Sequence, residues 1–505
     1  MFLVMSLLML FRKSTLEEFS RLSRSFNLIP VYEFIPADML TPVLAYMRIR
    51  RKGVFTFLLE SVEDTLNFGR YSFIGLNPVK ELYNYRKKTF LRYEEAVAEI
   101  PDTDIFTALK RELEGITQPQ IEGLPYFKGG AAGFIGYENT ELFEPSLGSS
   151  EQKSSIPDSY LGIFRDLIAF DHLKHQLILI SNVHVKPDQS AQEQFSQSQE
   201  RLANLKQLLS SIVPHPGPFS ITSYIKQEID SNRFTESFDR IKEHILDGDV
   251  FQLVLSEKFS AEYSGDPFHV YRTLRMINPS PYMYILEMPG EIKVIGTSPE
   301  DLVRVKDGKA TILPIAGTRR RGTTTEDDNR LAEELIHDPK ENAEHTMLVD
   351  LARNDLGRVC SYGSVSLTED RTIKLYSHVM HIVSRVEGKV RDDISTVDVL
   401  AASFPAGTVT GAPKVRAMEI IKKLEPEPRG LYAGAVGYFD YSGNMDMCIA
   451  IRSFFIRENI ITWQAGAGIV LDSQPELEMK EIYNKARVMT EAILAAGRID
   501  EHTRH

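Results

Sequence analysis

Runs of apolar, β-branched and aromatic residues, many of them alternating with polar positions, recur along the whole chain. Strands favour this composition and this two-residue period. Short turns such as YSGNM (441–445) join successive runs, so neighbouring strands should pair antiparallel. The pattern therefore predicts an α+β architecture with large, mostly antiparallel sheets. The strand candidates are residues 53–62, 167–183, 250–263, 363–370, 433–441 and 448–466.

Two segments in the C-terminal half have the helical period instead. In the first, Asp338 can cap a helix and Pro339 suits its first position. In the second, Ser473 or Gln474 can act as the cap, and Gly497 ends the pattern. This second helix carries an apolar stripe that predicts burial in the core. The stripe consists of Met479, Ile482, Ala486, Met489 and Ile493.

Each of these helices carries two glutamates three residues apart, Glu341 and Glu344 in the first and Glu478 and Glu481 in the second. Residues at this spacing share a helix face, so the two helices together could surround one hard cation with four carboxylates. The hypothesis is a magnesium site. Taken alone, each pair is more typical of solvated surface charge, and Glu341 could complete a capping box with Asp338.

The organisation of the chain suggests two regions. The proline-rich stretch VPHPGPFS (213–220) disfavours helix and continuous strand, and it is the best linker candidate. We expect one region at 15–212 and another at 221–498. Residues 148–159 are typical of a polar surface loop, and 185–200 of a polar entry to a helix.

Composition narrows the possible functions. A chain of 505 residues is longer than one hydrophobic core usually supports, and 43% hydrophobic with 25% charged residues is typical of a folded, water-soluble protein. The net charge of -12 argues against nucleic-acid binding. Cys360 and Cys448 form no C-x-x-C motif, so we expect a reducing, cytoplasmic setting. The apolar run 1–11 is too short to span a bilayer, and we interpret it as a packed segment or an over-extended start.

Three glycine-rich turns lie near the acidic helices, at 314–322, 404–421 and 464–473. Their backbone amides could approach an anionic ligand closely. None is a nucleotide-binding P-loop, because no Ser or Thr follows the lysine of GTVTGAPK.

Taken in order, these segments resemble the chorismate-binding enzymes, and among them the large (component I) subunits of anthranilate synthases. The N-terminal half resembles them more loosely, through LLES (58–61), RYSFIG (70–75) and PYFKGGAAGFIGYE (125–138). The stronger motifs are FQLVLSEKF (251–259), PIAGTRRRG (314–322), AEHTMLVDLARNDLGRV (343–359), YSHVMHIVSRVEG (376–388), FPAGTVTGAPK (404–414), YAGAVGYF (432–439), CIAIRS (448–453), QAGAGIVLDSQPE (464–476) and NKAR (484–487).

The resemblance implies a fold of large antiparallel sheets in a two-unit sandwich, with helices outside. It also implies a magnesium-dependent lyase reaction, the first committed step of tryptophan biosynthesis. In that reaction ammonia adds to the chorismate ring, the ring hydroxyl leaves, and pyruvate is eliminated to give anthranilate. Glu344 and Glu481 would bind Mg²⁺ directly, and Glu341 and Glu478 would bind it through water.

Matching residue by residue implies the rest of the active site. His381 would assist the elimination, Glu300 would act as general acid or base for the departing hydroxyl, and Thr408 would be a further polar pocket residue. Outside these motifs, an isolated histidine is more often structural. Residues expected to line the chorismate site are Gly317, Thr318, Tyr432, Arg452, Gly466, Ala467, Gly468 and Lys485. Arg452 could otherwise be a surface charge, and Lys485 a helical partner of Glu481.

Two positions separate the possible activities within the family. Isochorismate- and salicylate-forming relatives carry a water-activating lysine where this chain has Gln252, which we therefore place in the catalytic set. Aminodeoxychorismate synthase, the alternative assignment, carries a nucleophilic lysine where this chain has Ala316. Both positions favour anthranilate formation.

Partners follow from what the sequence does not contain. Neither Cys360 nor Cys448 lies in the G-x-C-x-G turn of glutamine amidotransferases. The resemblance therefore implies a separate amidotransferase subunit (component II) as the ammonia source, in a heterotetramer of two plus two.

Feedback inhibition by tryptophan is the last implication. The motifs LLES and NPSPYM resemble the inhibitor-binding elements of this subunit, which points to Glu60, Ser61, Pro281, Tyr282 and Met283. The alternative is that LLES only ends a buried strand and PSPYM forms a turn. A non-catalytic chorismate or tryptophan sensor is a further alternative, which the presence of Glu344, Glu481 and His381 disfavours.

Overall fold

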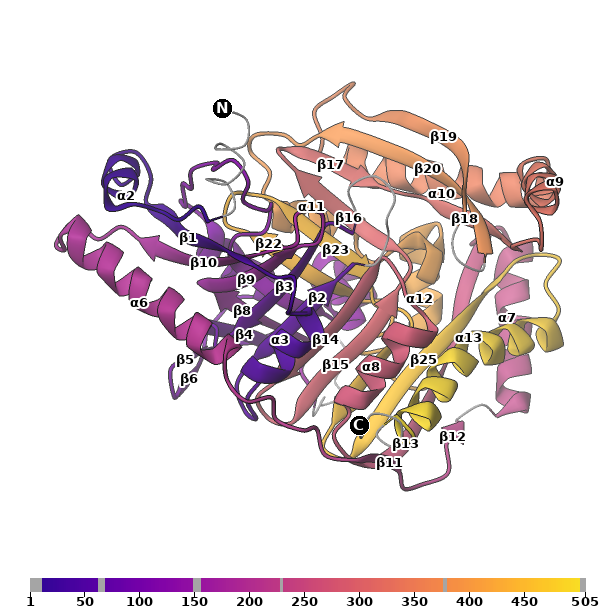
Figure 1. Cartoon of the computed structure of the whole chain (residues 1–505). Coiled ribbons are helices and arrows are strands. Elements are labelled where there is room, and N and C mark those ends of the chain that lie inside the picture. The colour runs from indigo at the N-terminus through magenta and orange to yellow at the C-terminus, as the bar shows by residue number, and fades with distance from the viewer. Residues whose placement is uncertain (1–10, 62–68, 149–155, 228–229, 376–378, 500–505) are drawn as a thin grey trace.

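The computed structural model describes residues 11–61, 69–148, 156–227, 230–375 and 379–499, and its strands form two large sheets (Figure 1). The first sheet has 13 described strands, in the order β1 (Leu28–Pro36), β10 (Gln176–His184), β9 (Asp166–Asp171), β3 (Tyr71–Leu76), β2 (Thr56–Glu60), β14 (Tyr282–Met288), β15 (Ile292–Ser298), β24 (Ser453–Arg457), β25 (Ile460–Ile469), β13 (Gln252–Gly265) and β11 (Phe219–Ile221), with β12 (Lys226–Gln227) and β21 (Gly411–Ala412) also paired to β13.

The second sheet has 12 described strands, in the order β18 (Ile315–Arg320), β20 (Val379–Lys389), β17 (Lys309–Ile312), β16 (Asp301–Lys306), β23 (Met445–Ile449), β22 (Ala435–Asp440), β7 (Gly130–Ile135), β8 (Ser159–Phe164), β4 (Lys80–Tyr85), β5 (Lys88–Tyr93) and β6 (Ala96–Glu99), with β19 (Ser366–Leu375) paired to β20. Among the described residues every strand pairing is antiparallel. The predicted α+β fold with antiparallel sheets is confirmed.

Both sheets take strands from both sides of the predicted linker. In the first sheet β2 pairs with β14, which places Leu58 opposite Ile285. In the second sheet β7 pairs with β22, which places Gly133 opposite Gly437. The linker is irregular as far as Pro218, after which β11 begins. The division at 15–212 and 221–498 is therefore not a division between sheets. The resemblance implies regulatory elements in the first region and the catalytic region in the second, and this assignment stays a prediction.

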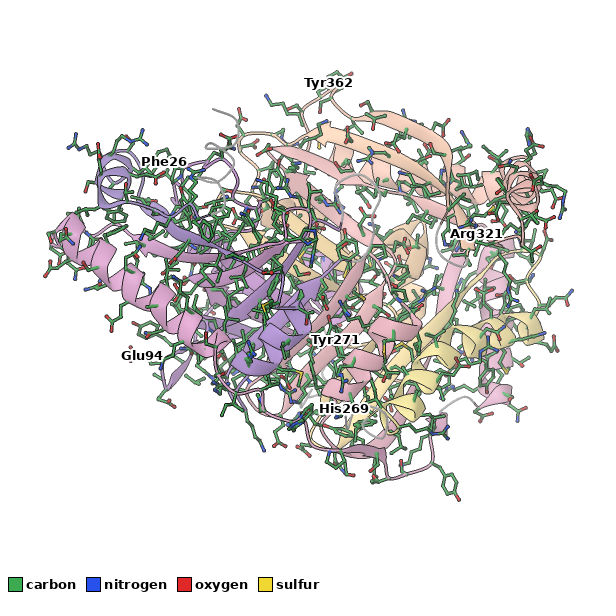
Figure 2. All side chains as sticks on the ribbon, in the orientation of Figure 1. Phe26, Glu94, His269, Tyr271, Arg321 and Tyr362 are labelled. Atoms are coloured by element: carbon green, nitrogen blue, oxygen red, sulfur yellow. The ribbon has the colours of Figure 1, made fainter. Side chains whose placement is uncertain are left out.

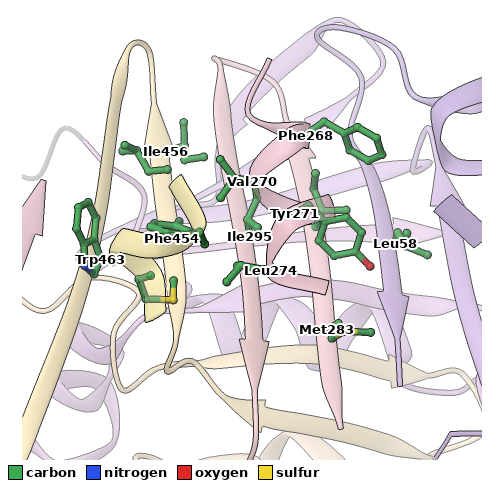
Figure 3. Packing of buried hydrophobic residues seen from close by; sticks show 14 of the residues in the cluster. Leu58, Phe268, Val270, Tyr271, Leu274, Met283, Ile295, Phe454, Ile456 and Trp463 are labelled. Atoms are coloured by element: carbon green, nitrogen blue, oxygen red, sulfur yellow. The ribbon is translucent and has the colours of Figure 1, made fainter. Parts of the chain in front are cut away.

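Three apolar layers hold the sheets and helices together. Aromatic residues such as Phe57 of β2 and Phe134 of β7 fill the space between the two sheets. The outer face of the first sheet is covered by α2 (Leu16–Leu22), α3 (Pro42–Ile49), α6 (Ala191–Leu209), α7 (Ser231–Leu246), α8 (Phe268–Ile277) and α13 (Pro475–Ala496). Figure 3 shows part of this layer, with Tyr271 and Leu274 of α8 packed near Ile295 of β15.

The second sheet has its own helical cover. Its outer face packs against α4 (Ile105–Leu113), α10 (Pro339–Gly357) and α11 (Thr396–Ser403), while α9 (Thr325–Ile336) packs on β18 and β20. Helix α12 (Lys414–Leu424) contributes to both outer layers. Shorter elements are η1 (Tyr137–Asn139), α5 (Thr140–Phe143), η2 (Pro145–Leu147) and η3 (Gly407–Val409). The helices thus lie outside the sandwich, as predicted.

The two acidic helices begin and end near the predicted residues. Asp338 caps α10 by accepting the backbone N–H groups of Lys340 and Glu341, and Pro339 takes the first position. Helix α13 follows Gln474 and ends at Gly497, and its predicted stripe packs into the core. Gln474, one of the two predicted residues, takes the cap position of α13, but its side chain makes no capping hydrogen bond, and the Ser473 hydroxyl accepts the N–H of Val470 in the preceding turn.

Other local predictions hold in part. The polar segment before α6 ends in a capping box between Ser190 and Glu193, as a helix entry should. The predicted loop at 148–159 ends earlier, because Ser159 is buried at the start of β8. Residues 149–155 of that loop, 1–10 of the apolar N-terminal run and 376–378 of the histidine motif lie outside the described residues. No helix in the described ranges is both long enough and apolar enough to cross a bilayer.

Candidate active site and inhibitor cavity

The residues predicted to bind chorismate lie where the second sheet, η3, β25 and α13 meet. Gly317 and Thr318 belong to β18 and His381 to the adjacent β20, while Thr408 lies in η3. Tyr432 precedes β22, and Arg452 lies between β23 and β24. Gly466, Ala467 and Gly468 are consecutive in β25, and Lys485 is on α13.

His381 is held against β18 by a defined hydrogen bond. Its Nδ1 donates to the carbonyl of Gly317 at 2.9 Å, and the Thr318 hydroxyl lies 3.1 Å from the same nitrogen. Burial lowers the pKa of His381, and the charge of Arg452 acts in the same direction. With the proton on Nδ1, Nε2 is the nitrogen that can accept a proton from a substrate. The ring is therefore oriented as a neutral base.

Glu300 is a half-buried carboxyl between β15 and β16. Burial raises its pKa to about 7, while the Thr408 hydroxyl and the charges of Lys485 and Arg452 lower it. A carboxyl with this pKa is partly protonated at neutral pH and can both donate and accept a proton. The influence of Thr408, Lys485 and Arg452 on Glu300 shows that these predicted residues share one region.

Two glycines of β25 make room for neighbouring side chains. A Cβ on Gly466 would lie 2.6 Å from the Tyr432 hydroxyl, and a Cβ on Gly468 would lie 2.6 Å from Nε2 of Gln252. Lys485 donates from Nζ to the carbonyl of Gly466 at 3.0 Å. The structure thus brings Gln252, Tyr432 and Lys485 to one strand. The Oε1 atom of Gln252 is buried without a hydrogen-bond partner among the described residues.

The four predicted metal-binding glutamates face a common region but are not gathered around one point. Burial raises the pKa of Glu344 and of Glu478, and the charge of Glu481 raises both further. Glu481 is paired with Lys485 at 2.7 Å, and Glu341 with Arg319 at 3.2 Å. Among the described residues no group of three His, Cys, Asp or Glu side chains is arranged to hold a metal ion.

Glu341 does not form a capping box with Asp338, which was the alternative to a role in metal binding. The Glu341 side chain binds Arg319 of β18, while the backbone N–H of its cap residue, Asp338, donates to the carbonyl of Leu335. Arg319 also donates to Asp338 at 3.0 Å. The arginine-rich turn after Gly317 thus supplies an internal cation to the start of α10, which the sequence reasoning did not assign. Its signal was the arginine run of PIAGTRRRG.

A second site lies between the two sheets. All five residues predicted for the inhibitor, Glu60, Ser61, Pro281, Tyr282 and Met283, line one cavity of about 720 Å³. They meet because β2 and β14 are neighbours, with Met283 opposite Glu60. The cavity is also lined by residues that sequence reasoning did not single out, among them Arg70, Tyr71, Lys128, Tyr284, Arg304 and Tyr438. Arg70, Tyr71 and Lys128 belong to the motifs RYSFIG and PYFKGG.

The cavity wall offers both charges and aromatic surface. Glu60 accepts hydrogen bonds from the hydroxyl of Tyr271 and from Nε of Arg275 at 3.1 Å, both on α8. Tyr271 is fully buried in the interior, where α8 covers the first sheet (Figure 2). Tyr282 donates to Asp446 at 2.9 Å and accepts from Arg304 at 2.7 Å. Such a wall suits a zwitterion that carries a large apolar ring.

Beside the catalytic region a buried ion pair stabilises the backbone. Arg429 donates to Glu425 through Nε and Nη2, each at 2.7 Å, and both side chains are almost fully buried. The guanidinium also donates to the carbonyls of Val409 and Val254, and it lies 5.5 Å from the centre of the Tyr432 ring. This pair positions η3 and Tyr432, and sequence reasoning missed it because neither residue lies in a quoted motif.

Known proteins are similar to this chain in sequence over most of its length. The sequence profile of the family described as chorismate binding enzyme matches residues 56–491. The chain is 41% identical to anthranilate synthase component 1 of Acetivibrio thermocellus and 42% identical to that of Aquifex aeolicus, each alignment covering 96% of this chain and 99% of the relative.

Solved structures agree as well. Anthranilate synthase component I from Streptococcus pneumoniae superposes with a TM-score of 0.71 at 36% identity, over 90% of this chain and 99% of that one. The menaquinone-specific isochorismate synthase of Escherichia coli shares the fold, with a TM-score of 0.69 at 20% identity over 95% of this chain and 98% of that one. By profile, by sequence and by fold, the chain belongs to the family of chorismate-binding enzymes.

Proposed function

We propose that this chain is the chorismate-converting subunit of an anthranilate synthase and forms anthranilate, pyruvate and water from chorismate and ammonia. The observation that carries the proposal is the similarity to anthranilate synthase component 1 over nearly the whole length of both chains. Gln252 and Ala316 support it, because neither position has the lysine expected for water addition or for the para-amino product.

Two cationic side chains account for the binding of a dianion by an acidic protein. Arg452 offers a planar fork that matches a carboxylate, and Lys485 offers a point charge beside Gly466. Lys485 is paired with Glu481, so substrate and Glu481 compete for its charge. A cation that takes over Glu481 would release Lys485 for the substrate.

Acid and base roles follow from the two perturbed groups. Glu300, with a pKa near 7, is suited to donate a proton to the departing ring hydroxyl, which then leaves as water. His381, whose pKa is lowered by burial, is suited to accept the ring proton lost in the elimination of pyruvate. The hydrogen bond from Nδ1 to Gly317 keeps Nε2 as the accepting atom.

Magnesium is the cofactor that we propose for this site. Glu344 and Glu481 would bind it directly, and Glu341 and Glu478 through water. Electrostatics supports this donor set: burial raises the pKa of Glu344 and of Glu478, and the charge of Glu481 raises both further, a repulsion between carboxylates that a divalent cation would relieve. When bound, the ion would neutralise one substrate carboxylate.

Ammonia would come from a separate glutaminase subunit (component II), and we expect two copies of each chain in the complex. We also propose that tryptophan binds the cavity between the sheets and inhibits the enzyme. The charged groups at Glu60 and Arg304 suit its amino and carboxylate groups, and the aromatic wall suits its indole ring.

Product analysis tests these proposals directly. The purified chain is incubated with chorismate, Mg²⁺ and ammonium, with and without tryptophan, and with excess chelator as a control. We expect anthranilate and pyruvate in equal amounts, suppressed by tryptophan and by the chelator. Isochorismate or a para-amino product would show that the reaction type inferred from Gln252 and Ala316 is wrong. Tight chorismate binding without any product would instead indicate a sensor.

A further inference from the structure

Asn278 lies at the C-terminal end of α8, and its side chain bonds to two other residues. Its backbone N–H donates to the carbonyl of Leu274 at 2.8 Å, which closes the last turn of the helix. Its side-chain Nδ2 donates to the hydroxyl of Thr297 at 2.9 Å, and its Oδ1 accepts from Nη1 of Arg452 at 3.5 Å. The second contact is at the long limit of a hydrogen bond, so a small shift of Asn278 would break it.

Thr297 completes a closed ring of three residues. Its backbone N–H donates to the carbonyl of Arg452 at 3.1 Å, so each of Asn278, Thr297 and Arg452 is bonded to the other two. Arg452 has a φ of 49°, in the left-handed region that non-glycine residues rarely adopt. The ring therefore holds both the unusual backbone and the guanidinium of an arginine proposed to bind the substrate.

The same segment forms a wall of the inhibitor cavity. Pro281, Tyr282 and Met283 follow Asn278 within five residues and line the cavity, and Met283 lies opposite both Glu60 of β2 and Thr297 of β15. Glu60, also in the wall, binds Tyr271 of α8. Figure 3 shows Tyr271, Leu58 and Met283 in this region, next to the strand that carries Ile295.

A second set of hydrogen bonds connects the cavity wall to the segment around Arg452. Tyr284, another cavity residue, shares a hydrogen bond of 2.5 Å with the hydroxyl of Ser453, the residue after Arg452. Ser453 in turn donates to the carbonyl of Ile451 at 2.8 Å, the residue before Arg452. The cavity wall is thus bonded to the chain on both sides of Arg452.

We propose that Asn278 is a positioning residue for Arg452 and that the ring Asn278–Thr297–Arg452 transmits occupancy of the inhibitor cavity to the substrate carboxylate. The regulatory part of this inference rests on the proposed function. A ligand that moves the 281–283 wall also moves Asn278, and the guanidinium loses the orientation that a bidentate carboxylate contact requires. Because coupling between two ligands is reciprocal, chorismate should weaken tryptophan binding by the same factor.

Asn278→Ala, Thr297→Val and the matched control Thr297→Ser test the ring. Thr297→Val removes the hydroxyl and keeps the branched shape, while Thr297→Ser keeps the hydroxyl. Without tryptophan, we expect Asn278→Ala to raise the chorismate KM by about tenfold with kcat within about twofold, Thr297→Val to do so by about threefold, and Thr297→Ser to match the unmodified chain. Thermal unfolding of each variant separates this change from a loss of fold.

Calorimetry measures the coupling. Tryptophan is titrated with and without chorismate, with no ammonium or glutamine present, so that chorismate is not consumed. In the unmodified chain chorismate should raise the tryptophan Kd about tenfold, and in Asn278→Ala the two Kd values should agree within about twofold. The tryptophan Kd without chorismate should change little, because Asn278 does not line the cavity.

Three results would overturn the proposal. An unchanged chorismate KM together with unchanged coupling in Asn278→Ala would remove Asn278 from the pathway. Loss of tryptophan binding in that variant would make Asn278 part of the ligand site. An equal KM increase in Thr297→Ser and Thr297→Val would show that the hydroxyl is irrelevant. If the unmodified chain binds no tryptophan, the regulatory part of the proposal is wrong. The comparison of chorismate KM values still tests whether Asn278 positions Arg452. If the unmodified chain turns over no chorismate, the chorismate Kd replaces KM.

Discussion

The cavity proposed for the inhibitor and the proposed catalytic region differ in how their residues are brought together. The cavity has its full wall, because β2 and β14 are hydrogen-bonded neighbours and their register places Glu60 opposite Met283. The catalytic region has its residues on separate elements, and its charged groups are bound to one another. Lys485 pairs with Glu481, and Glu341 with Arg319.

Strand register alone brings the five residues predicted for the inhibitor to one cavity, whereas the predicted catalytic residues come together through contacts between separate elements and include internal ion pairs. Lys485 pairs with Glu481, and burial together with the charge of Glu481 raises the pKa of Glu344 and of Glu478. Substrate and metal would replace these internal pairs. The catalytic region should therefore be more sensitive to loss of charge, and the cavity more sensitive to change of shape.

The largest effect is expected from Glu481→Gln, which removes one proposed metal ligand and the partner of Lys485. We expect kcat/KM to fall by roughly 10³-fold, with thermal stability nearly unchanged because the side chain is half exposed. Steady-state kinetics at saturating Mg²⁺ measures it. Glu476→Gln, an exposed carboxylate in the first turn of the same helix, is the control and should keep full activity. Full activity in Glu481→Gln would reject the catalytic role of this charge.

Glu300→Gln should lower kcat by roughly 10²-fold and change the pH profile. The acid must be protonated, and burial raises its pKa to about 7, so kcat/KM should fall as the pH rises through 7. The pKa of His381 is lowered from 6.5, and the neutral ring is needed, so kcat/KM should also fall as the pH drops below that lowered value. Glu300→Gln should remove only the alkaline limb, and an unaltered profile would contradict the assignment.

Ser61→Phe and Ser61→Ala test the cavity by shape. Phenylalanine should fill part of the space and raise the tryptophan concentration for half inhibition by about tenfold or more. Alanine removes one hydroxyl and should raise it by about threefold. Chorismate KM and kcat without tryptophan should stay within about twofold for both. Equal inhibition in the two variants and the unmodified chain would place the inhibitor elsewhere.

The smallest effect is expected from Ser190→Ala, which removes the capping box of α6 on the outer face of the first sheet. Loss of such a cap costs about 1 kcal/mol of folding free energy. Thermal unfolding should show a small decrease in Tm, while the chorismate KM and the tryptophan response should not change. A change in either would mean that general destabilisation alone alters the two sites and would weaken the comparison between them.

Local sequence patterns predicted the elements well. The cap at Asp338, the apolar stripe from Met479 to Ile493 and the turn at 441–445 depend on neighbouring residues, and each appears as expected. The five residues that the family motifs predict for the inhibitor line one cavity, while their role in binding it stays a prediction. These signals are contained within short stretches of chain.

Contacts between distant segments could not be predicted in this way. The pairing of β2 with β14 joins residues more than 200 positions apart, and no local pattern encodes it. The partners of Glu60 on α8 depend on that pairing, and the ring around Arg452 depends on another distant contact, between Thr297 and Arg452. The internal pairs of Glu341 and Glu481 were also unpredictable, because spacing on a helix shows which face a carboxylate occupies but not which cation reaches it.

The shared sheets have a consequence for how feedback control can be lost in evolution. Each sheet joins an N-terminal strand to a C-terminal strand, at β2–β14 and at β7–β22. Deleting the N-terminal part would expose the edges of β14 and β22 and remove one side of the aromatic layer between the sheets. The proposed inhibition therefore cannot be discarded by losing a module. The chain can become insensitive only through individual substitutions in a wall that the catalytic half also needs in order to fold.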